Sequence, residues 1–130
     1  MTEKELVSNF FIEGCKNKNY DLVMTYLADD YIDHSPAGAR SNQDAVGILK
    51  AVAQMFGNLQ VEVLDIFAES GMVATRIQYR ALHIGECLGI AATGKELVFE
   101  ALENFKVCEE KIVESWGCWP DKQIEQMLMN

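Results

Sequence analysis

Residues Ala81 to Trp116, ALHIGECLGIAATGKELVFEALENFKVCEEKIVESW, contain the pattern that decides the fold. Apolar and polar residues alternate from Leu97 to Val107 and again from Lys111 to Trp119, on either side of the acidic pair Glu109-Glu110. Alternation with a period of two predicts strands, and a short polar break between two such runs predicts a hairpin. The glycine-containing segment from Gly85 to Gly94 has no such period, so we expect it to be irregular and flexible.

A second hairpin is predicted upstream of this stretch. Residues Leu59 to Ala68 and Met72 to Ile84 both alternate, and Glu69-Ser70-Gly71 between them has the composition of a tight turn. These four strands follow one another along the chain, which predicts an antiparallel meander.

The first half of the chain has a helical period instead. A capping box at Thr2 and Glu5 predicts a helix that runs to about Lys16, and Tyr20 to Ala28 predicts a shorter second helix. Ser41 and Asp44 resemble another cap, and the third helix should end near Gly57. Asp29 to Arg40 is predicted to be a loop, and Asp121 to Met129 a short terminal helix.

Three helices followed by four strands predict an α+β fold in one domain that spans residues 1–130. We expect the three N-terminal helices to pack in the concave face of a strongly curved antiparallel sheet. Such a sheet leaves a cone-shaped pocket between its concave face and the helices.

Composition narrows the classes of partner. The net charge of −9 argues against nucleic acid and against an anionic membrane surface. No basic, apolar leader is present at the N-terminus, and the four cysteines form no CxxC pair, so we expect reduced thiols and a cytoplasmic location. With this negative net charge, we expect the partner to be a small hydrophobic organic ligand instead of nucleic acid or a membrane surface.

Several short motifs resemble the SnoaL-like polyketide cyclase family, within the nuclear-transport-factor-2-like superfold. The matching segments, in chain order, are Tyr31-Ile-Asp-His34-Ser-Pro36, His83-Ile-Gly85-Glu86, Thr93-Gly94-Lys95, the strand with Phe99 and Glu103, Lys111 to Trp116, Asp121 and Gln126-Met-Leu128. The resemblance implies the cone-shaped fold, and it implies an enzyme that needs no metal and no cofactor.

In the family's characterised cyclases an aspartate on the last long strand acts as acid and base in an aldol ring closure. Here the corresponding positions hold Gly117 or Cys118, so that aspartate is absent from its usual place. Where such cyclases have a histidine on the preceding strand, this chain has Glu103.

Three residues are candidates for catalysis. Glu103 has the strand parity of Phe99 and Phe105, which predicts a carboxyl group among apolar side chains with a raised pKa, suited to proton transfer. A bulge in the strand would instead turn it to solvent. His34, in the predicted loop, would either contact a ligand or brace the loop, and His83 would be either a pocket residue or a satisfied core histidine.

The predicted pocket walls and ligand contacts are Trp116, Phe56, Phe99, Phe105, Tyr79 and Asp121. Asp121 would otherwise cap the terminal helix. His83, Glu86 and Cys87 suggest a metal site, but residues four apart on a strand lie roughly 13 Å apart. We therefore expect no metal.

Three functions remain open from the sequence. The first is a cofactor-independent enzyme that moves a proton on a small hydrophobic carbonyl compound, of cyclase, isomerase or hydrolase type. The second is a non-catalytic binder of a small apolar ligand. The third is an interaction module whose outer sheet face forms a homodimer, and a dimer is compatible with the other two. Exposure of Val73, Ile77 or Val113 on that face would favour the dimer.

Overall fold

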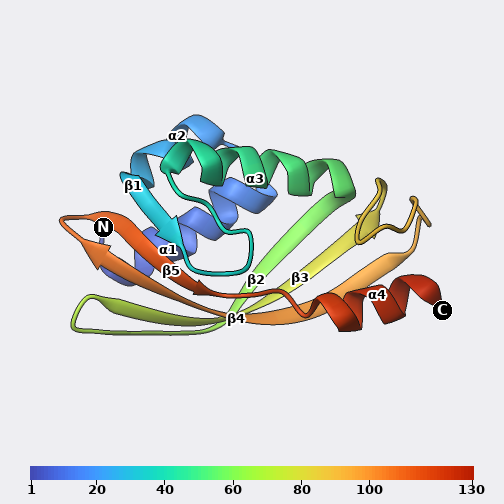
Figure 1. Ribbon diagram of the computed structural model, residues 1–130. Helices are drawn as coiled ribbons and strands as arrows, with labels where there is room; N and C mark the ends of the chain where they lie inside the picture. The colour runs from blue at the N-terminus through green and yellow to red at the C-terminus, as the bar shows by residue number, and fades with distance from the viewer.

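A curled, unclosed five-stranded sheet carries helices α1 to α3 on its concave side in the computed structural model, which describes residues 1–130 (Figure 1). In chain order the elements are α1 (Glu3–Phe11), a π-helical turn (Ile12–Lys16), α2 (Tyr20–Tyr26), β1 (Leu27–Asp33), α3 (Asn42–Met55), β2 (Phe56–Glu69), β3 (Met72–His83), β4 (Glu96–Cys108), β5 (Lys111–Gly117) and α4 (Asp121–Met129). The α+β class is confirmed. No helix in the structure is long and apolar enough to cross a membrane.

The sheet contains one strand that the sequence did not predict. Its order is β1-β5-β4-β3-β2, and β1 pairs with β5 in parallel, whereas all other neighbours are antiparallel. The four predicted strands are present, but β1 covers residues predicted as a helix end and a loop. Asp29 and Asp30 interrupt its apolar residues, and its partner lies more than 80 residues away, with Asp33 opposite Ser115. Local sequence therefore carried no strand signal there.

Polar caps fix the starts of α1 and α3. The Thr2 side chain accepts a hydrogen bond from the Glu5 backbone N–H, and the Glu5 carboxylate accepts one from the Thr2 N–H, both at 3.1 Å. This confirms the predicted capping box. Ser41 similarly accepts from the Asp44 N–H at 3.0 Å at the start of α3.

Strict alternation of burial on β3 and β4 separates an inner from an outer face. Val73 and Ile77, which we considered for an exposed outer surface, are instead fully buried on the concave side. Their strand parity matches that of Tyr79 and His83, and it turns all four toward the helices. The same alternation places Phe99, Ala101, Glu103 and Phe105 on the inner side of β4.

A bulge in β5 changes which of its side chains face inward. Lys106 lies opposite Glu114, whereas the next residue of β4, Val107, lies opposite Ile112, so Val113 is an extra residue on β5. Ile112 is fully buried and Ser115 is buried, although an uninterrupted strand would place them on opposite faces. The bulge thus turns Ser115 and Gly117 toward the helices and Trp116 away from them.

Candidate functional site

A cavity of about 430 Å³ lies between the concave face of the sheet and the helices. Its wall consists of Phe10, Phe11, Cys15, Tyr31, Asp33, Ser35, Pro36, Ala39, Ala45, Ile48, Leu49, Val52, Met55, Phe56, Tyr79, Cys87, Leu88, Glu103, Phe105, Ser115, Gly117, Cys118, Trp119, Asp121 and Ile124. Most of these residues are apolar, and the polar ones come mainly from β1, β3, β4 and β5. This composition is typical of a site for a small organic ligand.

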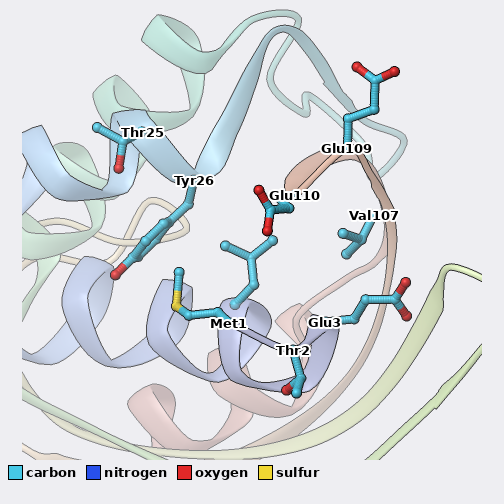
Figure 2. A pocket seen from close by; sticks show the side chains of 9 residues that line it. Met1, Thr2, Glu3, Thr25, Tyr26, Val107, Glu109 and Glu110 are labelled. Atoms are coloured by element: carbon cyan, nitrogen blue, oxygen red, sulfur yellow. The ribbon is translucent and has the colours of Figure 1, made fainter.

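A second hollow of about 380 Å³ lies at the N-terminus, beside the β4–β5 turn (Figure 2). Its rim carries Glu3, Glu109 and Glu110, and Tyr26 and Val107 form part of its wall. None of the residues predicted as catalytic or ligand-binding lies there. We therefore place the candidate site in the larger cavity.

Glu103, on β4, is one of three residues with carboxyl groups that line this cavity. Its Oε2 accepts a hydrogen bond of 2.6 Å from the phenol of Tyr79, on the adjacent strand. Burial raises the pKa of Glu103 to about 7, the Tyr79 hydrogen bond opposes that rise, and the negative charge of Asp33 adds to it. Near neutral pH this carboxyl group can therefore both accept and return a proton, as a general acid/base must.

Tyr79 stays a phenol in this environment. Burial, followed by the charge of Glu103, raises its pKa well above the ordinary value. The hydroxyl group therefore keeps its proton and donates it in the hydrogen bond that orients the carboxylate. Oε1 of Glu103 has no such partner, so it is the oxygen free to reach a ligand.

Gly117 makes the space that the Glu103 side chain occupies. The two residues are paired across β4 and β5. A Cβ atom at position 117 would lie 3.0 Å from both Cα and Cγ of Glu103 and 2.6 Å from the Leu102 carbonyl oxygen. Gly117 also has φ of +140°, which L side chains rarely adopt. A side chain at position 117 would therefore collide with Glu103.

Two hydroxyl groups, of Tyr31 and Ser115, also line the cavity. Tyr31 on β1 and Ser115 on β5 are both buried, and their oxygens are hydrogen-bonded to each other at 2.5 Å. Burial raises the pKa of Tyr31 above its usual range, so both groups remain protonated. One proton is used in the mutual bond, and the other is free to donate into the cavity. Ser115 and Gly117 lie on the same face of β5, so their Cα atoms are roughly 7 Å apart, and Gly117 is paired with Glu103.

The predicted walls divide into lining and supporting residues. Phe56, Phe105, Tyr79 and Asp121 line the cavity. Phe99 lies behind the wall, where its ring packs 5.3 Å from that of Tyr79. Trp119, Asp33, Tyr31 and Ser115 are among the lining residues that were not predicted from the sequence. Trp119 itself, an aromatic residue directly before Pro120, was the only signal for its position, whereas the other three depend on the pairing of β1 with β5.

His34 and Trp116 lie on the outer side of the sheet, away from the cavity. Their rings stack 5.0 Å apart at 12°, and His34 Nε2 is 2.8 Å from the Glu114 carboxylate. Asp33 faces the cavity and His34, the next residue, faces outward, which agrees with strand alternation. The structure therefore brings neither side chain to Glu103.

His83 is fully buried beyond the cavity wall, beside Phe56. Its Nδ1 accepts a hydrogen bond of 3.1 Å from the Thr93 backbone N–H, and the Thr93 hydroxyl lies 2.9 Å from the same atom. This nitrogen therefore carries no proton, so Nε2 carries it, and Nε2 has no partner. His83 anchors the loop that ends at Lys95 and does not contact the cavity.

This curled sheet over helices, with a largely apolar cavity and an inward carboxyl group, defines the class of small cone-shaped α+β pocket proteins. Within that class, the family model of the SnoaL-like polyketide cyclases matches residues 5–128, and the chain belongs to this family. No curated protein sequence matches the chain.

Solved structures share the fold at low identity. AclR from Streptomyces galilaeus is 24% identical, with a TM-score of 0.84 over 98% of this chain and 95% of that one. A SnoaL-like polyketide cyclase from Agrobacterium tumefaciens is 14% identical, with a TM-score of 0.84 and 98% of each chain covered. An LEH-like epoxide hydrolase from M. tuberculosis is 16% identical, with a TM-score of 0.74 over 98% of this chain and 89% of that one. At these identities the similarity establishes the fold alone.

Proposed function

We propose that this protein is a cofactor-independent enzyme that moves a proton at the carbon next to a carbonyl group in a small hydrophobic compound. The observation that carries the proposal is the Glu103 carboxyl group, which lies in an apolar cavity, has a pKa of about 7 and is oriented by the Tyr79 phenol. Membership of the SnoaL-like family supports the same class of activity.

In the proposed reaction Glu103 acts first as a base. Its free oxygen removes the proton from the carbon next to the carbonyl group, and the electron pair of that C–H bond moves to form an enolate. The Tyr31–Ser115 pair has one proton available for the enolate oxygen, which would stabilise the charge where it develops. Glu103 then returns a proton to the same carbon or to another. Isomerisation, ring closure and exchange with solvent all begin with the formation of this enolate.

The matching test measures exchange of solvent deuterium into acetylnaphthalene by proton NMR. The wild-type protein should accelerate exchange, and Glu103→Gln should lower the rate at least about 100-fold, because an amide cannot take up the proton. The rate should rise between about pH 6 and pH 8, since only ionised Glu103 is a base and its pKa is about 7. Equal rates in the two proteins would refute the proposal.

A non-catalytic binder of a small apolar ligand is the second candidate. The observation in its favour is that Gly117 and Cys118 occupy the positions where cyclases of this family are expected to carry an aspartate. Binding of acetylnaphthalene without any Glu103-dependent exchange would support it.

Three further proposals, which come from the sequence, apply to both candidate functions. The protein acts in the cytoplasm, which its scattered cysteines favour, and needs no cofactor. It forms a homodimer through the outer face of the sheet, which Leu102 and Phe67 support because each is 69% exposed.

A further inference from the structure

The charges inside the cavity are all of one sign. Three lining residues, Asp33, Glu103 and Asp121, carry carboxyl groups, and no Lys, Arg or His is among the lining residues. The ion pairs of the molecule involve Arg76, Arg80, Lys106 and His34, and none reaches the cavity. The carboxyl groups that line the cavity therefore have no cationic partner within the protein.

Asp33 and Glu103 each keep an oxygen for a ligand. Asp33 Oδ1 accepts a hydrogen bond of 3.0 Å from the Ser35 backbone N–H, and its other oxygen has no partner. Glu103 is bonded through Oε2 only. Asp33 lies opposite Ser115 and Glu103 lies opposite Gly117, two residues further along β5, and both line the same cavity. In agreement with this placement, the charge of Asp33 raises the pKa of Glu103. A buried carboxylate is costly unless it is paired, so a cation placed between the two would relieve both the burial and the repulsion.

The walls around these carboxyl groups also suit a cation. The aromatic lining residues are Phe10, Phe11, Tyr31, Phe56, Tyr79, Phe105 and Trp119. The faces of such rings attract a positive charge, and this attraction increases when the site excludes water. An apolar skeleton would fill the volume between α1, α3 and the sheet while its charged group contacts the carboxylates.

We infer that the ligand of this cavity is an apolar compound that bears a protonated nitrogen, bound between Asp33 and Glu103. The inference rests on the proposed function in that it adds a positive charge to the same substrate. A cation at Asp33 would favour the ionised form of Glu103, so the bound substrate would itself generate the base that acts on it. The titratable groups that interact electrostatically with Glu103 are Asp33, Tyr79, Tyr31 and Cys15, and none of them is a cation.

Three ligands of one skeleton test the charge preference, namely naphthylethylammonium, acetylnaphthalene and naphthoate. At constant ionic strength we expect the ammonium to bind at least about tenfold more tightly than the carboxylate, with the ketone between them. The double variant Asp33→Asn/Glu103→Gln should bring the three affinities within about threefold. Glu62→Gln, which removes an exposed charge outside the cavity, is the control and should leave the order unchanged.

Proton linkage provides a second measurement. Calorimetric titrations at about pH 7, in two buffers of different ionisation enthalpy, report the protons released on binding. The ammonium should displace roughly half a proton, because free Glu103 is half protonated near its pKa of about 7 and the cation lowers that pKa. The ketone should release none. An ammonium that binds no better than naphthoate, or that releases no proton, would overturn the inference.

The outcomes separate this inference from the proposed function. If acetylnaphthalene exchanges in a Glu103-dependent way but the ammonium has no advantage, the proposed reaction stands and the charge preference fails. If the ammonium is preferred and releases a proton but no ligand undergoes exchange, the charge preference stands and the protein is a binder.

Discussion

Glu103 makes the stability of the protein depend on pH in a direction opposite to that of an ordinary paired carboxylate. Its pKa is about 7 in the folded protein and about 4.5 when unfolded. Between these values the folded state binds more protons than the unfolded state, so the free energy of unfolding falls as the pH rises. A shift of this size corresponds to a loss of up to about 3 kcal/mol.

Glu103→Gln should abolish that loss. We expect urea unfolding at about pH 4.5 and about pH 8 to show a decline in the wild-type protein that is smaller in the variant by about 2 to 3 kcal/mol. The Gln side chain retains a carbonyl oxygen for the Tyr79 hydroxyl, so the hydrogen bond is kept. Parallel pH dependence in the two proteins would show that Glu103 is well solvated.

Gly117 provides a second test at the scale of single residues. Gly117→Ala should destabilise the protein by about 1 to 3 kcal/mol, because the methyl group meets the Leu102 carbonyl and Glu103 at an unfavourable φ. Gly47→Ala is the matched control, since a Cβ atom there meets nothing within 4 Å and the residue lies inside α3. Gly47→Ala should stabilise the helix by up to about 1 kcal/mol. Equal effects of the two substitutions in denaturant titrations would contradict the steric role of Gly117.

At the scale of elements, β5 shows where prediction from sequence succeeded and where it failed. Alternation predicted the strand, but no composition signal marks Val113 as an extra residue. The bulge moves every later residue of β5 to the opposite face of the sheet from the one that simple alternation predicts. Trp116 therefore faces outward and Ser115 inward. On β4 the alternation is uninterrupted, and a simple parity argument places Glu103 on the side where the structure has it.

The end of β1 yields the prediction at this scale. Asp33 and His34 are consecutive, yet one lines the cavity and the other stacks on Trp116 outside it. His34→Ala should lower stability by about 1 kcal/mol through loss of the Glu114 contact and the ring stacking. It should change ligand affinity and deuterium exchange by less than about twofold. A tenfold or larger loss of exchange in a stable variant would return His34 to the catalytic site.

At the scale of the whole molecule, the helices cover one face of the sheet and leave the other without a covering layer (Figure 1). The register places Trp116 opposite Asn104, Asn104 opposite Ala74 and Ala74 opposite Phe67, in one row across that outer face. Leu102 lies two residues from this row on β4. Isolated exposed apolar residues are common, but several on one sheet face resemble the apolar part of an interface.

These residues make the proposed homodimer testable. Leu102→Lys should convert a dimer into a monomer in multi-angle light scattering, because it places a charge from each protomer in an apolar, symmetric interface. Ile84→Lys is the control, since Ile84 is 52% exposed but follows the end of β3, away from the row. The cavity lies on the opposite face of the sheet, so Leu102→Lys should leave affinity for the naphthyl ligands unchanged. A wild-type protein that remains monomeric at high concentration would exclude the dimer, and the outer apolar residues would then be isolated surface side chains.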